Sequence, residues 1–305
     1  LEEGMRAAAR AVHAPVCRFL VDTFPGRLDR GAGLPAPQRL PYFPEMVQER
    51  LQGLKHLVLA GARSPVSFFK YDGIPSDLVP EGCRVIQLAE RGENVLESLV
   101  ALCDALDATN EGYPVSEYSR ATAPEGRMDT KSFAAAISAT LPEFAIIADE
   151  SGTSGAPSFF ATAGCPPHTS LYLTGGGIGM GLPLATGAAV ACPDRRVVAL
   201  QGDGGAMYTI QALWTQAREG LNVTNVIFAN RKYEILNWEL ARAGEASPAP
   251  RVRALTSLDD PPIDFSGLAR SLGVPAFRPE TAEELSRVLE SAFHEPGPSL
   301  IEVAF

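Results

Sequence analysis

The sequence has 305 residues, enough for two domains of about 150 residues each, and its 46% hydrophobic and 20% charged residues are typical of a globular protein. The net charge of −10 and the lack of a Lys/Arg-rich run argue against nucleic acid as a partner. Five cysteines without a C-x-x-C pair argue against a disulfide framework or a structural zinc site, and they favour a reducing, cytoplasmic location.

The first third of the chain alternates between helical and extended patterns. In chain order the hydrophobic periodicity predicts a helix to His13, a strand at 16–21, a helix at 42–54, strands at 56–60 and 83–88, and a helix at 93–106. Such alternation predicts parallel strands joined by crossover helices. The first residues already have the pattern of the middle of an amphipathic helix, without a signal-peptide layout, so we expect the natural protein to extend upstream of Leu1.

Residues 109–128 lose periodicity and collect Pro, Gly, Ser and Thr, which predicts a linker between an incomplete domain of residues 1–108 and a second domain of residues 129–305. The alternation then resumes, which predicts a second doubly wound α/β domain. Its predicted elements are helices at 130–140, 206–219, 263–272 and 282–293 and strands at 144–148, 196–200, 223–229 and 300–303.

Residues 151–193 carry no Asp, Glu, Lys or Arg, which on a crude scan resembles a membrane span. Nine glycines and five prolines interrupt the stretch, so we interpret it as a buried, turn-rich segment and predict no membrane association. Within it, Gly152-Thr153-Ser154-Gly155-Ala156 nearly matches the G-x-S-x-G nucleophile elbow of hydrolases, but Ala156 stands at the position that the motif reserves for glycine.

The most informative pattern is Gly202-Asp203-Gly204-Gly205 after one predicted strand and Asn230 after the next. Because the carboxyl ends of parallel strands meet at one edge of a sheet, Asp203 and Asn230 are predicted to converge there. Glycines at the start of a helix leave backbone N–H groups open to a phosphate. A carboxylate, an amide oxygen and a nearby carbonyl form an all-oxygen set that suits Mg²⁺ rather than zinc.

The G-D-G sequence, followed by 25 residues and then Asn, resembles the thiamine-diphosphate motif of the decarboxylase and acetolactate-synthase superfamily. The helix at 208–217, the run Asn230-Arg231-Lys232-Tyr233 and the glycine-rich run at 175–183 also resemble that superfamily. The resemblance covers essentially the whole chain, most closely the acetolactate-synthase-like and benzoylformate-decarboxylase-like members. It implies two α/β domains, a Rossmann-like central domain that is incomplete here and a thiamine-diphosphate-binding domain.

The resemblance also implies a metal and diphosphate site. Asp203 and Asn230 would be Mg²⁺ ligands, together with the backbone oxygen of Lys232. Gly204 and Gly205 would approach the diphosphate of the cofactor.

Three further residues are implied by the resemblance alone. Ile178 stands where the family places a large apolar side chain that bends the cofactor and brings its 4′-amino group near the thiazolium C2 carbon. Gly176 would offer its carbonyl to that amino group, and Thr153 would lie near the diphosphate. Without the family frame, an isoleucine among glycines is usually a core residue.

Two departures from the family pattern bear on function. The family activates the cofactor with a Glu on an N-terminal pyrimidine-binding domain, which we expect to be absent from this chain, so no catalytic acid is assigned. Leu236, beside Ile235, stands where pyruvate decarboxylases carry an acidic proton relay. An apolar group there disfavours protonation and favours carboligation. Trp238 is one residue out of register with a tryptophan of acetolactate synthases, so the acceptor substrate stays open.

The resemblance therefore implies decarboxylation of a 2-oxo acid such as pyruvate, followed by carboligation to an acetohydroxy acid, a reaction of branched-chain amino acid biosynthesis. The alternatives are a non-ligating 2-oxo-acid decarboxylase and a truncated, non-catalytic chain that binds only the cofactor. The implied cofactors are thiamine diphosphate and Mg²⁺, with FAD left open, as is a regulatory subunit. The implied assembly is a homodimer or homotetramer through the pyrimidine domain.

Overall fold

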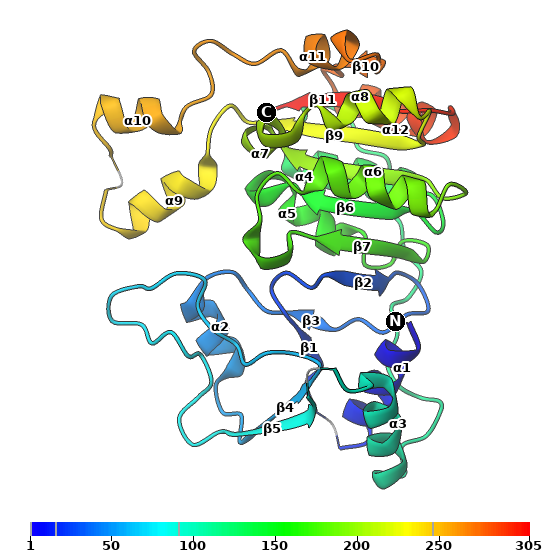
Figure 1. Cartoon of the computed structure of the whole chain (residues 1–305), viewed down its shortest axis with the longest axis vertical. Coiled ribbons are helices and arrows are strands. Elements are labelled where there is room, and N and C mark those ends of the chain that lie inside the picture. Colours follow the sequence, from blue (N-terminus) through cyan, green and yellow to red (C-terminus); the bar gives the residue numbers. More distant parts are fainter. Residues whose placement is uncertain (1, 16, 91, 246) are drawn as a thin grey trace. The chain divides into compact units, whose positions relative to one another are not determined.

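The computed structural model describes residues 2–15, 17–90, 92–245 and 247–305 (Figure 1). The predicted starts of the first helix at Leu1 and of the first strand at Val16 lie outside the described residues. The chain forms two compact units: the first contains the residues up to Pro25 together with Leu34–Ser116, and the second contains Gly26–Gly33 together with Glu117–Phe305.

The first unit alternates helices with short parallel strands. Strand β1 pairs with β3, and β4 pairs with β5, both in parallel, so the described strands of this unit form two pairs instead of one continuous sheet. Ala7 and Ala11 of the first helix pack against Leu99 and Cys103 of the last. The elements are α1 (Glu2–His13), β1 (Leu20–Val21), β3 (Gln38–Arg39), α2 (Pro44–Leu51), β4 (His56–Ala60), β5 (Arg84–Ala89) and α3 (Val95–Ala105).

The second unit is built on a seven-stranded sheet with the order β10-β11-β9-β8-β6-β7-β2. Every neighbouring pair is parallel except β2 and β7. The strands are β2 (Arg27–Arg30), β6 (Ile146–Glu150), β7 (His168–Tyr172), β8 (Val197–Gly202), β9 (Val223–Ala229), β10 (Ala276–Phe277) and β11 (Ser299–Ala304).

Helices cover both faces of this sheet, as the predicted doubly wound fold requires (Figure 1). On one face Phe133 of α4 and Leu285 of α12 pack against β8, β9 and β11, and on the other Leu182 of α6 and Phe265 of α11 do so. The helices are α4 (Thr130–Thr140), α5 (Gly152–Ala161), the 3₁₀ turn η1 (Thr174–Gly176), α6 (Gly181–Ala191), α7 (Asp203–Thr209), α8 (Ala212–Arg218), α9 (Glu234–Arg242), α10 (Pro250–Thr256), α11 (Phe265–Ser271) and α12 (Ala282–His294).

The interpretation of residues 151–193 as turn-rich is wrong: the segment contains α5, β7, η1 and α6. Prolines are typical of turns, but Pro183 lies in the first turn of α6, where the missing N–H removes no helical hydrogen bond. The predicted helix at 206–219 starts earlier, at Asp203, and is divided at Ile210 and Gln211 into α7 and α8. Within the described chain, none of the helices combines the length and apolar character needed to cross a bilayer.

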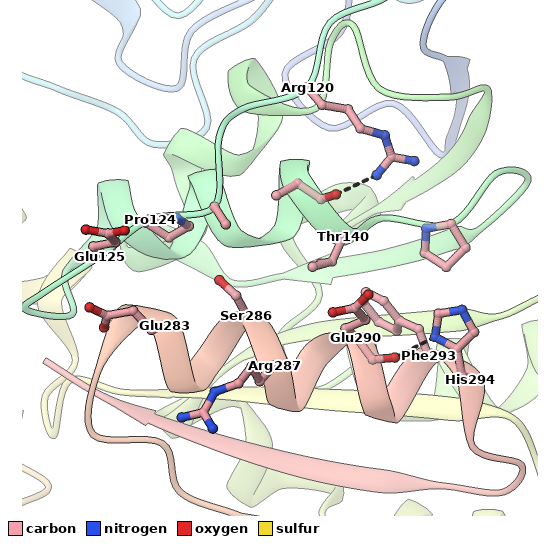
Figure 2. Close-up of a pocket in the computed structure, with 13 residues that line it drawn as sticks. Arg120, Pro124, Glu125, Thr140, Glu283, Ser286, Arg287, Glu290, Phe293 and His294 are labelled. Carbon is pink, nitrogen blue, oxygen red and sulfur yellow. Dashed lines mark hydrogen bonds between the residues drawn. The ribbon is translucent and has the colours of Figure 1, made fainter.

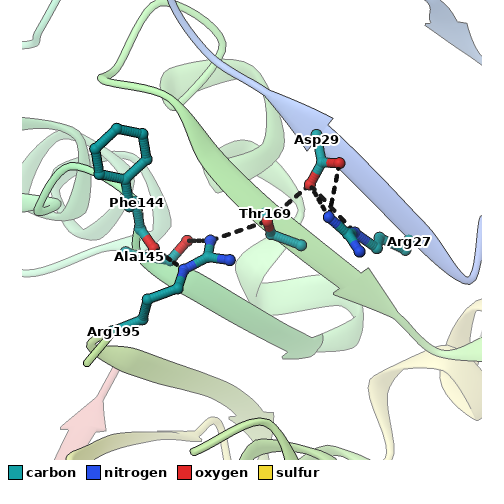
Figure 3. A network of polar contacts seen from close by, with 6 residues as sticks. All are labelled: Arg27, Asp29, Phe144, Ala145, Thr169 and Arg195. Atoms are coloured by element: carbon teal, nitrogen blue, oxygen red, sulfur yellow. Dashed lines mark hydrogen bonds and ion pairs between the residues drawn. The ribbon is translucent and has the colours of Figure 1, made fainter. Parts of the chain in front are cut away.

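Strand β2 was not predicted, because Arg27-Leu28-Asp29-Arg30 has no apolar run. It joins the sheet through a polar network with β7 (Figure 3). The carboxylate of buried Asp29 pairs with Arg27 at 3.0 Å and accepts a 2.7 Å hydrogen bond from the Thr169 hydroxyl. Arg195 in turn donates to Thr169 and to two backbone carbonyls just before β6. Backbone pairing with β7, the Asp29–Thr169 hydrogen bond and the burial of Leu28 together fix this edge strand.

Candidate functional site

The predicted site residues follow the carboxyl ends of four adjacent strands, β7, β6, β8 and β9. In the sheet, β8 lies between β6 and β9, and Glu150 of β6 is level with Gln201, while Gly202 is level with Phe228 of β9. The chain leaves β6 toward β7 on one side and returns through α6 to β8 on the other, so the strand order reverses at β6. A reversal of this kind opens a crevice at the carboxyl ends of the strands, where ligands of α/β proteins bind.

Asp203, the first residue of α7, is buried and only 4% exposed. Its Oδ1 accepts a 2.9 Å hydrogen bond from the Gly204 N–H, and its Oδ2 accepts a 2.6 Å bond from the Arg231 N–H. Burial raises the pKa of the Asp203 carboxyl above its ordinary value, and the backbone hydrogen bonds only partly oppose that rise. A buried carboxylate that receives only backbone N–H groups is a chemically suitable ligand for a hard cation.

Asn230 directly follows β9, and the bond from Arg231 to Asp203 brings the two predicted ligands to the same corner of the sheet. Its Nδ2 donates to Ser154 Oγ at 3.0 Å, and its Oδ1 accepts from the Lys232 N–H at 3.1 Å. Arg231, which lies between Asn230 and Lys232 in the sequence, has a left-handed φ of 58°, which turns the chain sharply after β9. The convergence of these residues follows from the sequence pattern, whereas the link to Ser154 of α5 was not predicted.

Lys232 forms an antiparallel bridge with Ser257. The two hydrogen bonds of the bridge belong to the neighbouring residues: Leu258 N–H donates to Arg231 at 2.8 Å, and Tyr233 N–H donates to Thr256 at 2.9 Å. The carbonyl of Lys232 therefore takes no part in the bridge, and its use as a metal ligand stays a prediction. Among the described residues no group of three or more His, Cys, Asp or Glu side chains is arranged to hold a metal, so a site here depends on amide and carbonyl oxygens.

Gly204 and Gly205 are packed against protein side chains. A Cβ on Gly204 would lie 2.5 Å from the Tyr233 ring, and a Cβ on Gly205 would lie 2.5 Å from Glu150 Oε1 and 2.6 Å from Gln201. Close packing therefore accounts for both glycines, in addition to the predicted approach of a diphosphate. Their N–H groups lie in the first turn of α7, where helical acceptors are lacking, although that of Gly204 is already bound by Asp203.

Thr153 lies in the first turn of α5. The preceding Ser151 does not cap this helix, because its hydroxyl and its N–H both bond to Asp149 Oδ1, at 2.5 Å and 3.0 Å. Gly152 has a left-handed φ of 57°. The uncapped N–H groups at the start of α5 lie next to Ser154, the partner of Asn230, which is an arrangement suited to an anion.

The glycine-rich loop at 174–181 holds Ile178 outside the core. The side chain of Ile178 is 58% exposed, which rules out the alternative reading of it as a core residue. Gly175 and Gly176 have left-handed φ angles of 66° and 72°, conformations that glycine adopts without strain. Glu150, a residue that sequence reasoning missed, accepts hydrogen bonds from this loop; its only sequence signal is an acid at the end of an apolar strand.

Helix α9 follows the Asn230 turn, and all nine of its described residues are at least partly exposed. Leu236 is 47% exposed and Trp238 is 42% exposed. Glu234, the first residue of this helix, is held by Lys232 Nζ at 3.0 Å and by the side chains of Asn237 and Trp238. Partial burial acts to raise the pKa of Glu234, but these contacts outweigh it and lower the pKa, so Glu234 is an ionised acceptor at neutral pH.

A groove of about 720 Å³ lies on another part of the second unit, between α4, α12 and the segment 120–125 (Figure 2). Its polar groups serve the fold. Arg120 donates to the Ala139 and Leu141 carbonyls at the end of α4, both at 2.8 Å, and Glu283 accepts from the Gly126 N–H at 2.9 Å. These bonds fasten the predicted linker to the second unit, and the groove is not part of the predicted site.

Comparison with known proteins gives a consistent result. Residues 153–303 match the family described as "Thiamine pyrophosphate enzyme, C-terminal TPP binding domain". The chain is 52% identical over 301 residues to a Mycobacterium tuberculosis protein provisionally named acetolactate synthase large subunit IlvX, covering 98% of this chain and 58% of that protein. It is 31% identical over 280 residues to the benzoylformate decarboxylase of Pseudomonas aeruginosa, covering 84% of this chain and 50% of that enzyme.

A solved structure is similar as well. The thiamine diphosphate-dependent 4-hydroxybenzoylformate decarboxylase of Rhodococcus jostii RHA1 superposes with a TM-score of 0.78 at 25% identity, covering 98% of this chain and 58% of that one. The chain thus spans about half to three fifths of the length of the proteins it matches.

Proposed function

The chain belongs to the thiamine pyrophosphate enzyme family, and from this premise we propose that the whole protein decarboxylates a 2-oxo acid such as pyruvate and joins the remaining two-carbon unit to a second 2-oxo acid, giving an acetohydroxy acid. The observation that supports the proposal is the pair of hydrogen bonds from the Arg231 N–H to Asp203 and from the Lys232 N–H to Asn230, which bring these residues to one corner at the carboxyl edge of the sheet, inside the region that matches the family. The relatives of this chain act in both ligation and decarboxylation, by their names.

The residues present fit thiamine diphosphate and Mg²⁺. Among the ion pairs of the described residues none includes Asp203. A divalent cation could therefore compensate the negative charge of its buried carboxylate. Asp203, Asn230 and the Lys232 carbonyl would hold Mg²⁺. The N–H groups at the starts of α5 and α7, near Thr153 and Gly205, would face the diphosphate.

When bound, the cofactor supplies the nucleophilic thiazolium carbon and the electron sink for decarboxylation. The contribution of the chain is positioning: the exposed Ile178 would support the ring system, and Gly176 would accept a hydrogen bond from the 4′-amino group. The activating Glu and the dimer or tetramer contacts of the family belong to our proposal for the whole protein, since the chain spans only 58% of the length of its 52% identical relative.

The choice of ligation over simple decarboxylation rests on α9. Leu236 is apolar, and Glu234 is an ionised acceptor already engaged by three side chains. Neither therefore provides a ready proton donor beside the metal turn, the segment 230–232 that carries the predicted metal ligands. Without such a donor, the two-carbon unit is expected to attack a second carbonyl. The second candidate, a non-ligating 2-oxo-acid decarboxylase, is favoured by the match to two benzoylformate decarboxylases.

The test is turnover of pyruvate by the protein with all the upstream sequence that its gene encodes, in the presence of thiamine diphosphate and Mg²⁺, with acetolactate and acetaldehyde resolved. Acetolactate as the main product supports the proposal, and acetaldehyde alone replaces it with the decarboxylase. The same assay on the 305-residue chain tests whether this part acts by itself or only binds the cofactor. A protein that neither binds thiamine diphosphate with Mg²⁺ nor turns over a 2-oxo acid would refute the proposed function.

A further inference from the structure

Glu150 is a buried acid at the carboxyl end of β6 that the proposed mechanism does not use. It is 7% exposed, and both of its carboxylate oxygens are engaged: Oε1 accepts from the Gly179 N–H and Oε2 from the Gly181 N–H, each at 2.6 Å. Bonds this short are typical of charge-assisted hydrogen bonds. Burying a carboxylate is unfavourable unless its oxygens are hydrogen-bonded, so two such bonds to the segment Gly179–Gly181 indicate a clamp on that segment.

Glu150 also occupies the position of a cap at the start of α6. Gly181 is the first residue of α6, and the N-cap residue Met180 offers no side-chain acceptor, so Glu150 Oε2 takes the place of a capping group at the positive end of the helix dipole. Rotating the Gln201 amide by half a turn lets it donate to Glu150 Oε2 at 3.3 Å and accept from the Ala206 N–H at 3.3 Å. The carboxylate therefore connects β6 to α6, β8 and α7.

The clamp acts on the residue that directly follows Ile178. The Gly179 N–H is held by Glu150, and the Gly179 carbonyl accepts a 2.7 Å hydrogen bond from the Thr209 hydroxyl of α7. A Cβ at Gly179 would lie 2.6 Å from Tyr208 Cβ, and its φ of 90° is open to glycine only. The peptide after Ile178 thus has one permitted position.

The backbone hydrogen bonds of the chain before Ile178 are local to the 3₁₀ turn: the Gly176 N–H donates to the Leu173 carbonyl at 3.1 Å and the Gly177 N–H donates to the Thr174 carbonyl at 3.5 Å. Gly175 and Gly176 have left-handed φ angles, and a Cβ at either position would meet nothing within 4 Å. Glycines in open space restrict the backbone least. The position of the exposed Ile178 side chain is therefore set from its carboxyl side, by the hydrogen bonds of Gly179.

From this geometry we infer that Glu150 is a positioning residue that fixes Ile178 against the cofactor by clamping the N–H groups of Gly179 and Gly181. The inference rests on the proposed function, because it requires a cofactor beside Ile178. Glu150 acts as a double acceptor in this role. In Glu150→Gln one oxygen becomes an NH₂ donor that faces a backbone N–H donor, so one clamp bond is lost at nearly constant side-chain volume.

The first arm of the test needs no cofactor. Hydrogen–deuterium exchange with mass spectrometry is measured on the full-length protein for peptides covering 174–184. We expect Glu150→Gln to speed exchange about tenfold or more at whichever of the Gly179 and Gly181 N–H groups loses its acceptor, the consequence of losing one hydrogen bond to a charged group. Glu143→Gln, the same change at an exposed position before β6, is the matched control and is expected to leave this peptide unchanged. Wild-type exchange in the Glu150→Gln variant overturns the clamp.

The second arm measures cofactor geometry. At saturating thiamine diphosphate and Mg²⁺, the rate of deuterium exchange at C2 of the bound cofactor, read by NMR after acid quench, is expected to fall about ten- to hundredfold in Glu150→Gln, since small misplacements of reacting groups have effects of this size. A residue that only stabilises the fold would leave the rate of the loaded, folded protein unchanged. An unchanged C2 exchange rate therefore overturns the inference while the proposed function stands.

A second variant guards against loss of folding. Thr209→Val removes the hydroxyl that holds the Gly179 carbonyl and is close in volume, so both exchange measurements are expected to change in the same directions as for Glu150→Gln. Wild-type values in Thr209→Val would contradict the clamp model even if Glu150→Gln did not fold. Failure of the wild-type protein to bind thiamine diphosphate would instead refute the proposed function, and the inference with it.

Discussion

The buried His168 is expected to make the free energy of unfolding of the second unit depend on pH. It lies on β7, is 3% exposed, and its Nδ1 is 2.9 Å from the Pro166 carbonyl, while its Nε2 is buried without a hydrogen-bond partner among the described residues. Burial lowers the pKa of His168 to about 4, and the positive charge of Arg30 on β2 acts in the same direction, against the Pro166 carbonyl and Asp29. The folded protein therefore keeps this imidazole neutral.

The sign of the pH effect follows from proton binding. Because the folded-state pKa lies below the unfolded value of 6.5, the unfolded chain binds the extra proton first as the pH falls. The contribution of His168 to stability is complete above pH 6.5 and is lost as the pH falls through 6.5 toward 4. A difference of about 2.5 pKa units corresponds to about 3 kcal/mol in total, of which about 2 kcal/mol is lost between pH 7 and pH 5.

The assay is urea unfolding at pH 7 and pH 5 followed by tryptophan fluorescence. Both tryptophans of the chain, Trp214 and Trp238, belong to the second unit, so the signal reports the unit that contains His168. His168→Asn retains a donor for the Pro166 carbonyl and is expected to lose about 2 kcal/mol of the wild-type difference between the two pH values. If the variant keeps the full pH difference, a group other than His168 causes it and the reasoning is refuted.

Three further predictions concern the site. Asp203→Ala is expected to abolish Mg²⁺-dependent binding of thiamine diphosphate measured by calorimetry, whereas Asp194→Ala, at an exposed position, keeps it; normal affinity in Asp203→Ala would exclude the assigned metal site. Gly204→Ala is expected to destabilise the fold by about 1–3 kcal/mol through overlap with the Tyr233 ring, and adding Tyr233→Ala is expected to recover part of that loss in urea unfolding; an additive double variant would contradict the packing. Leu236→Glu is expected to raise the ratio of acetaldehyde to acetolactate by adding a proton donor near the metal turn, and an unchanged product ratio would contradict the role given to that position.

The sequence predicted best those elements whose signal is strong and local. Strand 223–229 and helix 130–140 were predicted with the bounds that the structure shows, because a run of apolar residues and an amphipathic period each identify one kind of element. Strand β7 was missed because its sequence, His168-Thr169-Ser170-Leu171-Tyr172, has no apolar run. Helix α6 was missed because its glycines and its first-turn Pro183 are tolerated in a way that no local pattern reveals.

The candidate site divides in the same way. The pairing of Asp203 with Asn230 was predictable, because both follow apolar strands and parallel strands end at one edge. Glu150 was not, because a single acid after a strand carries no pattern, and its role depends on two N–H groups about thirty residues later in the chain. The assignments of the metal and cofactor residues stay predictions until the binding experiments above are done.

The sequence by itself determined the family, the doubly wound class and the two strands that present the polar residues, since these follow from periodicity and from a motif with fixed spacing. Three features were decided by the tertiary structure alone. The edge strand β2 joins the seven-stranded sheet of the second unit, the side chain of Ile178 is exposed, and the buried carboxylate of Glu150 holds the N–H of the next residue, Gly179. The physical reason is range: periodicity reports which face of an element is apolar, whereas hydrogen bonds between distant segments depend on where the packed elements bring them.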